Sequence, residues 1–382
     1  MDNKFNIRKS NIVEILNLLF NKPNISRAEI SKLINLNKAS VSDIINILIE
    51  KDLVNEIGTG NSGSSGGRKP ILLELNSKAG CSLGIDLGKD YVSFLLTDLK
   101  RNVLVYDYYK ENINKSNVIE ILIKIINRIE DTVKDYKYNL LGVTLAVHGR
   151  VHNNKIIFTP YYDLDQIDLN GELSKLLPNL YFHLENEANL AAVGEFSNSI
   201  EPLNNTVVMN IHSGIGSGII INGNLYTGLE GSAGELGHMI IIPNGKECPC
   251  GNRGCFEQYC SITALLEEFN NLSYIKAKTL KNLCDLYNAG NEDAISIISK
   301  NIELMSIGIN NICNFFAPDN IFINSELNYY IPEYLDLIKS NLSIRSSKEL
   351  AILPCKLDNK SNLYGAVNRC ITNFFNTFSD TI

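Results

Sequence analysis

The feature that most constrains the fold of this chain is a group of three cysteines within eight residues. Cys248, Cys250 and Cys255 follow His238 by ten residues or more, and Gly251 permits a tight turn between them. One imidazole and three thiolates at this spacing can form a tetrahedral site, and zinc prefers such a ligand set. Four protein ligands leave no position for water, so we predict a structural zinc ion. The alternative is a cluster of free thiols.

The cysteine count also bears on the cellular compartment. The chain has nine cysteines, an odd number, in 382 residues, which favours metal ligation in a reducing compartment over a disulfide framework. The opening residues do not resemble a secretory signal, and the apolar runs are too short to span a bilayer. A content of 45% apolar and 20% charged residues is typical of a folded chain of two or three domains. We therefore expect a cytoplasmic protein without membrane segments.

Three helices are predicted within the first 50 residues. Apolar residues recur at helical spacing over about 8–20. Ser26 and Glu29 have the spacing of a capping box at the start of a short second helix. Asn37 can cap a third helix that carries its apolar residues on one side. Two helices joined by about four residues, the second of them longer, are typical of a helix-turn-helix.

A β-hairpin is predicted directly after the third helix, with strands over 53–57 and 70–75 around a Gly/Ser-rich loop over 58–67. This hairpin fits the wing of a winged helix-turn-helix, because the basic residues at the end of its loop can meet phosphates or a minor groove. The start of the third helix can reach base edges. The predicted DNA contacts are Arg27, Lys38, Ala39, Ser40, Ser42, Arg68 and Lys69. The alternative is a helical protein-interaction module followed by a flexible linker.

Charge is unevenly distributed along the chain. Residues 1–74 carry ten Lys or Arg against eight Asp or Glu, a net charge of +2, so the total of −7 leaves −9 on the remainder. An acidic body repels nucleic acid. Binding of DNA is therefore expected at the N-terminal segment.

The sequence changes to an α/β pattern from Cys81 onward. This alternation predicts layered sheets with helices on both faces. A Gly-rich segment over 213–218 is expected to be a loop whose backbone approaches a phosphate or a sugar closely. Strands are predicted over 82–86, 91–98, 140–147, 207–211 and 219–221, and a helix over 119–133.

Several of these motifs together resemble the ROK family of bacterial sugar kinases and repressors. The resemblance is carried by the run from Ile211 through Gly228 to His238, the cysteine cluster, and the segments 84–88, 185–189 and 66–70. A winged helix before a ROK domain marks the repressor branch. The resemblance implies a winged helix-turn-helix over 1–76 and a two-lobed, actin-like sugar-kinase α/β domain over 77–382. The implied lobes are about 77–185 plus the C-terminal helix, and 186–365.

The resemblance also implies a sugar site. The family binds sugar through an Asn-Asp pair, through the Glu and His of Glu-x-Gly-His, and through a Glu after the last zinc cysteine. Carboxylates and amides suit a ring of hydroxyls, and the implied inducer is xylose or a related monosaccharide. The matching positions are Asn186, Glu187, Glu235, His238 and Glu257.

Three departures from the kinase pattern argue against phosphoryl transfer. Lys89-Asp90-Tyr91 follows Gly88 where the kinases have a Gly that approaches phosphate. Glu187 replaces the catalytic Asp, and the extra methylene displaces the carboxylate by about an ångström. Asn324-Ser325 replaces the Gly-Gly on the adenosine side. We therefore predict a non-enzymatic sugar sensor.

The implied mechanism is a shift between two states. Operator half-sites require two reading heads at a fixed spacing, so a dimer or a dimer of dimers is expected on double-stranded DNA. Sugar bound between the lobes is expected to favour an arrangement that misplaces the heads. Two alternatives stay open: a ROK kinase that phosphorylates a monosaccharide with ATP, and a repressor that answers to a protein or a phosphosugar. Tyr161, where the family commonly has Asn, keeps the second alternative open.

Overall fold

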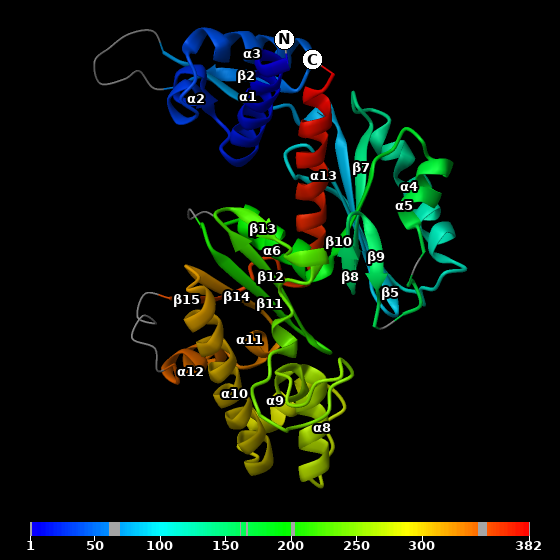
Figure 1. Ribbon diagram of the computed structural model, residues 1–382, viewed down its shortest axis with the longest axis vertical. Coiled ribbons are helices and arrows are strands. Elements are labelled where there is room, and N and C mark those ends of the chain that lie inside the picture. Colours follow the sequence, from blue (N-terminus) through cyan, green and yellow to red (C-terminus); the bar gives the residue numbers. More distant parts are fainter. Residues whose placement is uncertain are drawn as a thin grey trace. The chain divides into compact units, whose positions relative to one another are not determined.

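The computed structural model describes residues 2–60, 69–160, 162–165, 167–199, 203–342 and 350–381, and Arg68 and Tyr161 lie outside these ranges. The chain divides into two compact units (Figure 1). In the described ranges no helix combines the length and the apolar character that crossing a membrane requires. Unit 1 comprises Met1–Gly149, Asn154–Glu185 and Ala366–Ile382, and unit 2 comprises Arg150–Asn153 and Asn186–Gly365.

The first part of unit 1 is a winged helix, as predicted. The Ser26 side chain accepts a hydrogen bond from the backbone of Glu29, whose carboxylate accepts one from the Ser26 N–H at 3.0 Å. The Asn37 side chain accepts from the Ser40 N–H at 2.9 Å. These caps fix the starts of the second and third helices, and the first helix begins earlier than predicted. The elements are α1 (Asp2–Asn21), β1 (Ile25–Ser26), α2 (Arg27–Leu33), α3 (Lys38–Glu50), β2 (Val54–Thr59) and β3 (Ile71–Leu75), with the strands in the order β1-β3-β2.

The rest of unit 1 is a five-stranded sheet in the order β10-β7-β4-β5-β6. Every residue of β4 is buried, as expected of a central strand covered on both faces. Helices α4 and α5 lie on one face, and helix α13 lies on the other, where Cys370 packs near Gly142 (Figure 1). The elements are β4 (Cys81–Leu87), β5 (Tyr91–Asp98), β6 (Val103–Lys110), α4 (Val118–Val133), β7 (Leu140–Val147), β9 (Lys155–Phe158), α5 (Leu169–Leu176), β10 (Phe182–Asn186) and α13 (Ser361–Ser379), after a short 3₁₀ turn, η1 (Ser77–Ala79).

Unit 2 contains a second five-stranded sheet, in the order β13-β12-β11-β14-β15. Strands β11, β14 and β15 run parallel, and β12 and β13 are antiparallel additions. Apolar residues from β11, β14, α8, α9, α10 and α12 form one core. The elements are β8 (Arg150–His152), α6 (Glu187–Ser197), β11 (Thr206–Ile211), β12 (Ile215–Ile221), β13 (Asn224–Tyr226), η2 (Leu229–Gly231), η3 (Leu236–His238), α7 (Glu257–Cys260), α8 (Ile262–Leu272), α9 (Leu280–Asn288), α10 (Glu292–Phe316), β14 (Asn320–Asn324), α11 (Leu327–Tyr330), α12 (Tyr334–Ser340), β15 (Ala351–Pro354) and η5 (Asp358–Lys360).

One sequence prediction in unit 2 was wrong. Residues 213–218 were expected to form a loop, yet β12 begins at Ile215, and Gly216 and Gly218 pair with Asn210 and Val208 of β11. Pairing along the whole length of β11 outweighs the local preference of glycine for turns, because strand propensity depends strongly on its neighbours.

Candidate functional site

The predicted DNA contacts of the recognition helix lie together at the start of α3. Lys38 and Ala39 are exposed, whereas Ser40 and Ser42 are half-buried. The opposite side of the helix, from Val41 to Leu48, forms the core of the head. The exposed face is therefore free of a packing role, and its first turn has the position from which base edges are read.

Arg27 is placed differently from the other predicted contacts. Its guanidinium donates to the Glu56 carboxylate at 2.9 Å and to the Asn46 side chain at 3.2 Å. It therefore joins α2 to α3 and to β2. At the wing, Lys69 is exposed just before β3, and Arg68 lies outside the described residues.

The four predicted metal ligands meet in unit 2. The ligand atoms of His238, Cys248, Cys250 and Cys255 all lie within 4.8 Å of one another. Cys250 Sγ is 3.6 Å from Cys255 Sγ, and Cys248 Sγ is 3.6 Å from His238 Nδ1. A tetrahedron with zinc–sulfur bonds of about 2.3 Å has edges of roughly 3.8 Å. The donor set and its spacing therefore fit a tetrahedral zinc ion.

Local backbone geometry explains how the cysteines converge. The Cys248 N–H donates to the Asn252 carbonyl at 2.9 Å, which closes the turn. Gly254 has a φ of +88°, and a Cβ there would lie 1.8 Å from the Ile242 carbonyl oxygen, so only glycine fits. Burial and the neighbouring thiols raise the pKa of Cys255 to about 12. A bound divalent cation would reverse this cost by stabilising the thiolates.

Three of the predicted sugar residues lie around the His238 imidazole. Its Nδ1 faces Cys248 and is 3.5 Å from Glu257 Oε1, whereas its Nε2 is 3.9 Å from Glu235 Oε2. Glu235 is exposed, and the Glu257 side chain is mostly buried. The ring can therefore bind a metal through Nδ1 while Nε2 stays available for a polar ligand.

The other two predicted sugar residues begin α6. The Asn186 side-chain oxygen caps the helix, since it accepts from the N–H groups of Ala188 and Asn189 at 2.9 and 3.0 Å. The neighbouring Glu187 carboxylate accepts from Asn210 Nδ2 at 3.2 Å. The Asn186 oxygen is therefore used as the N-cap of α6.

Sequence reasoning missed two residues that hold Glu187. Asn324 Nδ2 donates to Asn210 Oδ1 at 3.3 Å, and Asn210 in turn donates to Glu187. Asn324 is one of the residues that replace the kinase Gly-Gly, and through Asn210 it helps to hold the Glu187 carboxylate that the sequence predicts to bind sugar. The contact joins residues 114 positions apart, so no local signal pointed to it.

Strand β12 joins the two groups of predicted sugar residues. At its start, Gly216 packs against the Glu187 carboxylate. The backbone of Ile215 and Ser217 packs against the glycines on either side of Glu235. The structure therefore brings the Asn186–Glu187 pair and the Glu235–His238 segment to one end of β12, within unit 2.

The segment that corresponds to the kinase phosphate loop is occupied by a side chain. The ring of Tyr91 covers Gly88 and stacks on Tyr108 with 5.3 Å between ring centroids. Its hydroxyl donates to Asp86 Oδ2 at 2.9 Å, and His148 Nε2 lies 2.8 Å from Asp86 Oδ1. In the kinases, Gly-Thr lets the backbone approach the phosphate closely. In this chain an aromatic ring occupies the corresponding space next to Gly88.

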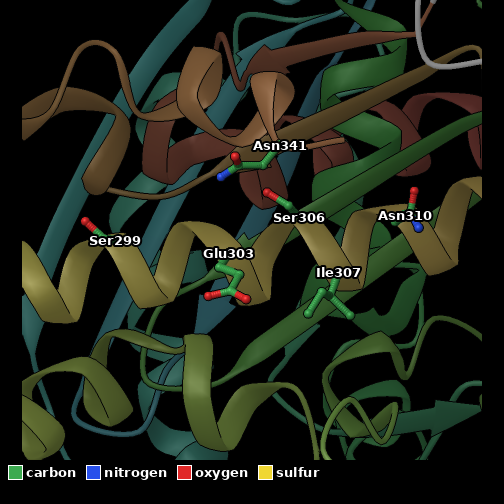
Figure 2. A pocket seen from close by; sticks show the side chains of 6 residues that line it. All are labelled: Ser299, Glu303, Ser306, Ile307, Asn310 and Asn341. Carbon is green, nitrogen blue, oxygen red and sulfur yellow. The ribbon is translucent and has the colours of Figure 1, made fainter. Parts of the chain in front are cut away.

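A pocket of about 450 Å³ lies elsewhere in unit 2, along α10 (Figure 2). Ser306 and Asn310 of α10 and Asn341 face it, and the Asn310 side-chain oxygen is buried without a hydrogen-bond partner. None of the residues predicted for DNA, metal or sugar lines this pocket, so it is separate from those sites.

Comparison with known proteins agrees with this architecture. Residues 82–371 match the model of the ROK family, and residues 9–55 match a winged helix-turn-helix DNA-binding model. The chain is 35% identical to a xylose repressor of Bacillus spizizenii over 96% of each chain. It is 39% identical to a xylose repressor of Staphylococcus xylosus over 90% of this chain and 89% of that one.

Solved structures show the same fold. A ROK family transcriptional regulator, a homologue of the Escherichia coli MLC protein, superposes with a TM-score of 0.80 at 22% identity, covering 98% of each chain. A ROK family glucokinase from Streptomyces griseus, solved with glucose and AMPPNP, gives 0.64 at 21% identity and covers 76% of this chain and 99% of its own. The glucokinase therefore matches only part of this chain.

The chain belongs to the ROK family. With its winged helix it is a DNA-binding transcriptional repressor of that family and not an enzyme, as the winged-helix match and the repressor relatives show. The predicted family and fold class are confirmed. The division at residue 76 and the lobe boundaries stay predictions.

Proposed function

We propose that this repressor acts in the cytoplasm on the operator of a xylose-utilisation operon and is released from it by xylose or a related monosaccharide. The observation that carries the proposal is the placement of two groups of polar side chains near the start of β12. One group is Asn186 and Glu187, and the other is Glu235 and Glu257 around His238. Relatives at 35–39% identity that are named xylose repressors support the choice of sugar.

Operator DNA in this proposal is bound by the first turn of α3 and by the wing. Lys38, Ala39, Ser40 and Ser42 meet base edges or phosphates, and Arg68 and Lys69 meet the backbone at the wing. Arg27 would have to exchange Glu56 and Asn46 for phosphate. Two heads, supplied by a homodimer or a dimer of dimers, would read the two half-sites of an operator.

The deciding test is operator binding with and without sugar. A labelled DNA from the protein's own upstream region is titrated by fluorescence anisotropy in the presence of D-xylose, L-arabinose or D-glucose. We expect D-xylose to weaken binding by about 5–150-fold, the usual range of allosteric coupling. Glu235→Gln should bind operator as the wild type does and respond poorly to xylose, whereas Glu267→Gln, on α8, should respond normally. Normal induction of Glu235→Gln would show that the assigned sugar site is wrong.

Zinc in this proposal is structural and is held by His238, Cys248, Cys250 and Cys255. Its chemistry would be that of a closed tetrahedral site, which fixes the orientation of the imidazole and thereby of Nε2. Metal analysis should find one zinc per chain in the wild type and in Cys313→Ser, and none in Cys250→Ser. Cys250→Ser should also bind xylose weakly while retaining operator affinity. Full xylose affinity in a zinc-free variant would contradict this role.

A further inference from the structure

Helix α13 belongs to both units of the molecule. Its first residues, Ser361 to Gly365, group with unit 2, and from Ala366 onward it groups with unit 1. Each end can be considered within its own unit. The helix continues without interruption through the point at which the division falls.

At the unit 2 end, α13 is held by α6, the helix that begins with the candidate sugar residues Asn186 and Glu187. Glu195 of α6 is only 2% exposed. Its carboxylate accepts from the Lys356 and Leu357 N–H groups at 2.9 and 3.0 Å and from Ser361 Oγ at 2.6 Å. A buried carboxylate with three donors fixes the segment that leads into α13.

The two helices also cross in direct backbone contact. A Cβ on Gly194 of α6 would lie 2.0 Å from the Ser361 carbonyl oxygen, and a Cβ on Gly365 of α13 would lie 1.8 Å from the Leu190 carbonyl oxygen. No side chain fits at this crossing. The first turn of α13 therefore has to follow any displacement of α6.

At the unit 1 end, α13 contacts the DNA-reading head. The Phe375 ring packs edge-to-face on Phe20 of α1, with 6.0 Å between centroids. Lys9 of α1 forms an ion pair with Asp380 at 2.6 Å. The Arg369 Nε–H donates to His183 Nε2 of β10 at 3.3 Å. The helix is thus fixed to both the sheet of unit 1 and the head.

Tyr138 connects α13 to the recognition helix. Its ring lies 5.7 Å from that of Phe374 and 5.9 Å from that of Phe378, measured between centroids. Its hydroxyl donates at 2.9 Å to the carbonyl of Lys51, the C-cap residue of α3. Next to it, Lys137 forms an ion pair with Asp52. A shift of α13 would therefore reach the C-terminal end of α3, the helix whose first turn carries the predicted DNA contacts.

We propose that α13 couples the sugar site to the reading head, and that Glu195 and Tyr138 are the positioning residues at its two ends. This inference rests on the proposed function. Sugar bound at the start of α6 would shift α6, the Gly194–Gly365 crossing and Glu195 would pass the shift to α13, and Tyr138 would pass it to α3. Neither residue belongs to the assigned sugar or DNA contacts, so each affects the coupling and not the two affinities.

The test is a linkage measurement on the full chain. Operator affinity is measured with and without saturating D-xylose, and xylose affinity is measured by calorimetry with and without operator. The two ratios must agree in each variant, because coupling is reciprocal. Tyr138→Phe keeps the ring and removes the hydroxyl, and its control is Tyr109→Phe on β6. Glu195→Gln removes the charge at the other end, and its control is Glu267→Gln.

We expect Tyr138→Phe and Glu195→Gln to keep both separate affinities within about twofold while the coupling ratio falls by about fivefold, the equivalent of one hydrogen bond. The controls should keep the wild-type ratio. A wild-type ratio in both test variants would overturn the role of α13 and leave the proposed function standing. A parallel loss of both affinities at an unchanged coupling ratio would also overturn the role of α13. A ratio of one in the wild type would overturn the proposed function, and this inference with it.

Discussion

At the scale of one residue, packing against α13 affects the protonation of His183. Burial, together with the nearby Arg369, lowers the pKa of His183 from 6.5 to about 4. The imidazole is therefore neutral near pH 7, and its Nε2 can accept the Arg369 hydrogen bond. The contact between β10 and α13 thus depends on an uncharged histidine.

The stability of unit 1 should consequently fall in mild acid. Below pH 6.5 His183 is protonated in the unfolded chain, whereas in the folded chain it stays neutral down to about pH 4. The loss of unfolding free energy therefore begins near pH 6.5 and is complete near pH 4. Between pH 7.5 and pH 5 this site should cost about 2 kcal/mol of unfolding free energy. Urea titrations at the two pH values measure the loss. In His183→Gln the loss of unfolding free energy between the two pH values should be smaller by about 2 kcal/mol. An equal loss in both proteins would refute the low pKa of His183.

Residues close together in sequence were predictable, and residues brought together by the fold were not. The four metal ligands lie within 18 positions, so the chemistry of the cluster could be inferred from spacing alone. The same reasoning could not see that Arg27 pairs with Glu56, or that Asn210 and Asn324 hold Glu187. These contacts depend on strand and helix packing that sequence spacing does not encode.

At the scale of the element, the N-cap of α3 controls the helix that faces DNA. The Asn37 side chain satisfies the Ser40 N–H, which otherwise has no partner in the first turn. Asn37→Ala should lower the unfolding free energy by about 1 kcal/mol and weaken operator binding. Asn37→Ser, which keeps an acceptor, should recover most of both. Urea unfolding and anisotropy measure the two effects, and wild-type values for Asn37→Ala would speak against the cap.

Elements with local signals were predicted well. The capping residues placed the starts of α2 and α3, and the apolar runs gave β5 and β7 their full length. Strand β12 was predicted too short because its glycines are typical of loops, whereas its pairing with β11 decides the structure. The start of α1 at Asp2 also lay outside the apolar pattern on which the prediction depended.

At the scale of the whole molecule, an acidic chain has to bind a polyanion through a small basic area. Removing the wing charges with Arg68→Ala and Lys69→Ala together should reduce the slope of log affinity against log salt by about 1.8 for each bound head, since each phosphate contact contributes about 0.9. Sugar binding should not change. The same pair of changes at Lys155 and Lys175, outside the head, serves as the control. A slope equal to that of the control would show that the wing does not meet the backbone.

The contact between the reading head and the last helix could not be inferred from sequence patterns. The ion pair between Lys9 and Asp380 joins residues 371 positions apart, and it places the head and the last helix in one compact unit. Composition and periodicity report on neighbours within a few turns. They carry no signal for a contact of this length.

The insertion of unit 2 within unit 1 has a consequence for biosynthesis. A ribosome has to make all of unit 2 before it reaches Ala366, so the β7 face around Gly142 and the Phe20 ring lack their partners while the intervening residues are made. Contacts that span so much chain form late. Any fragment that stops before Ala366 leaves the same apolar surfaces uncovered, and it should aggregate when made alone.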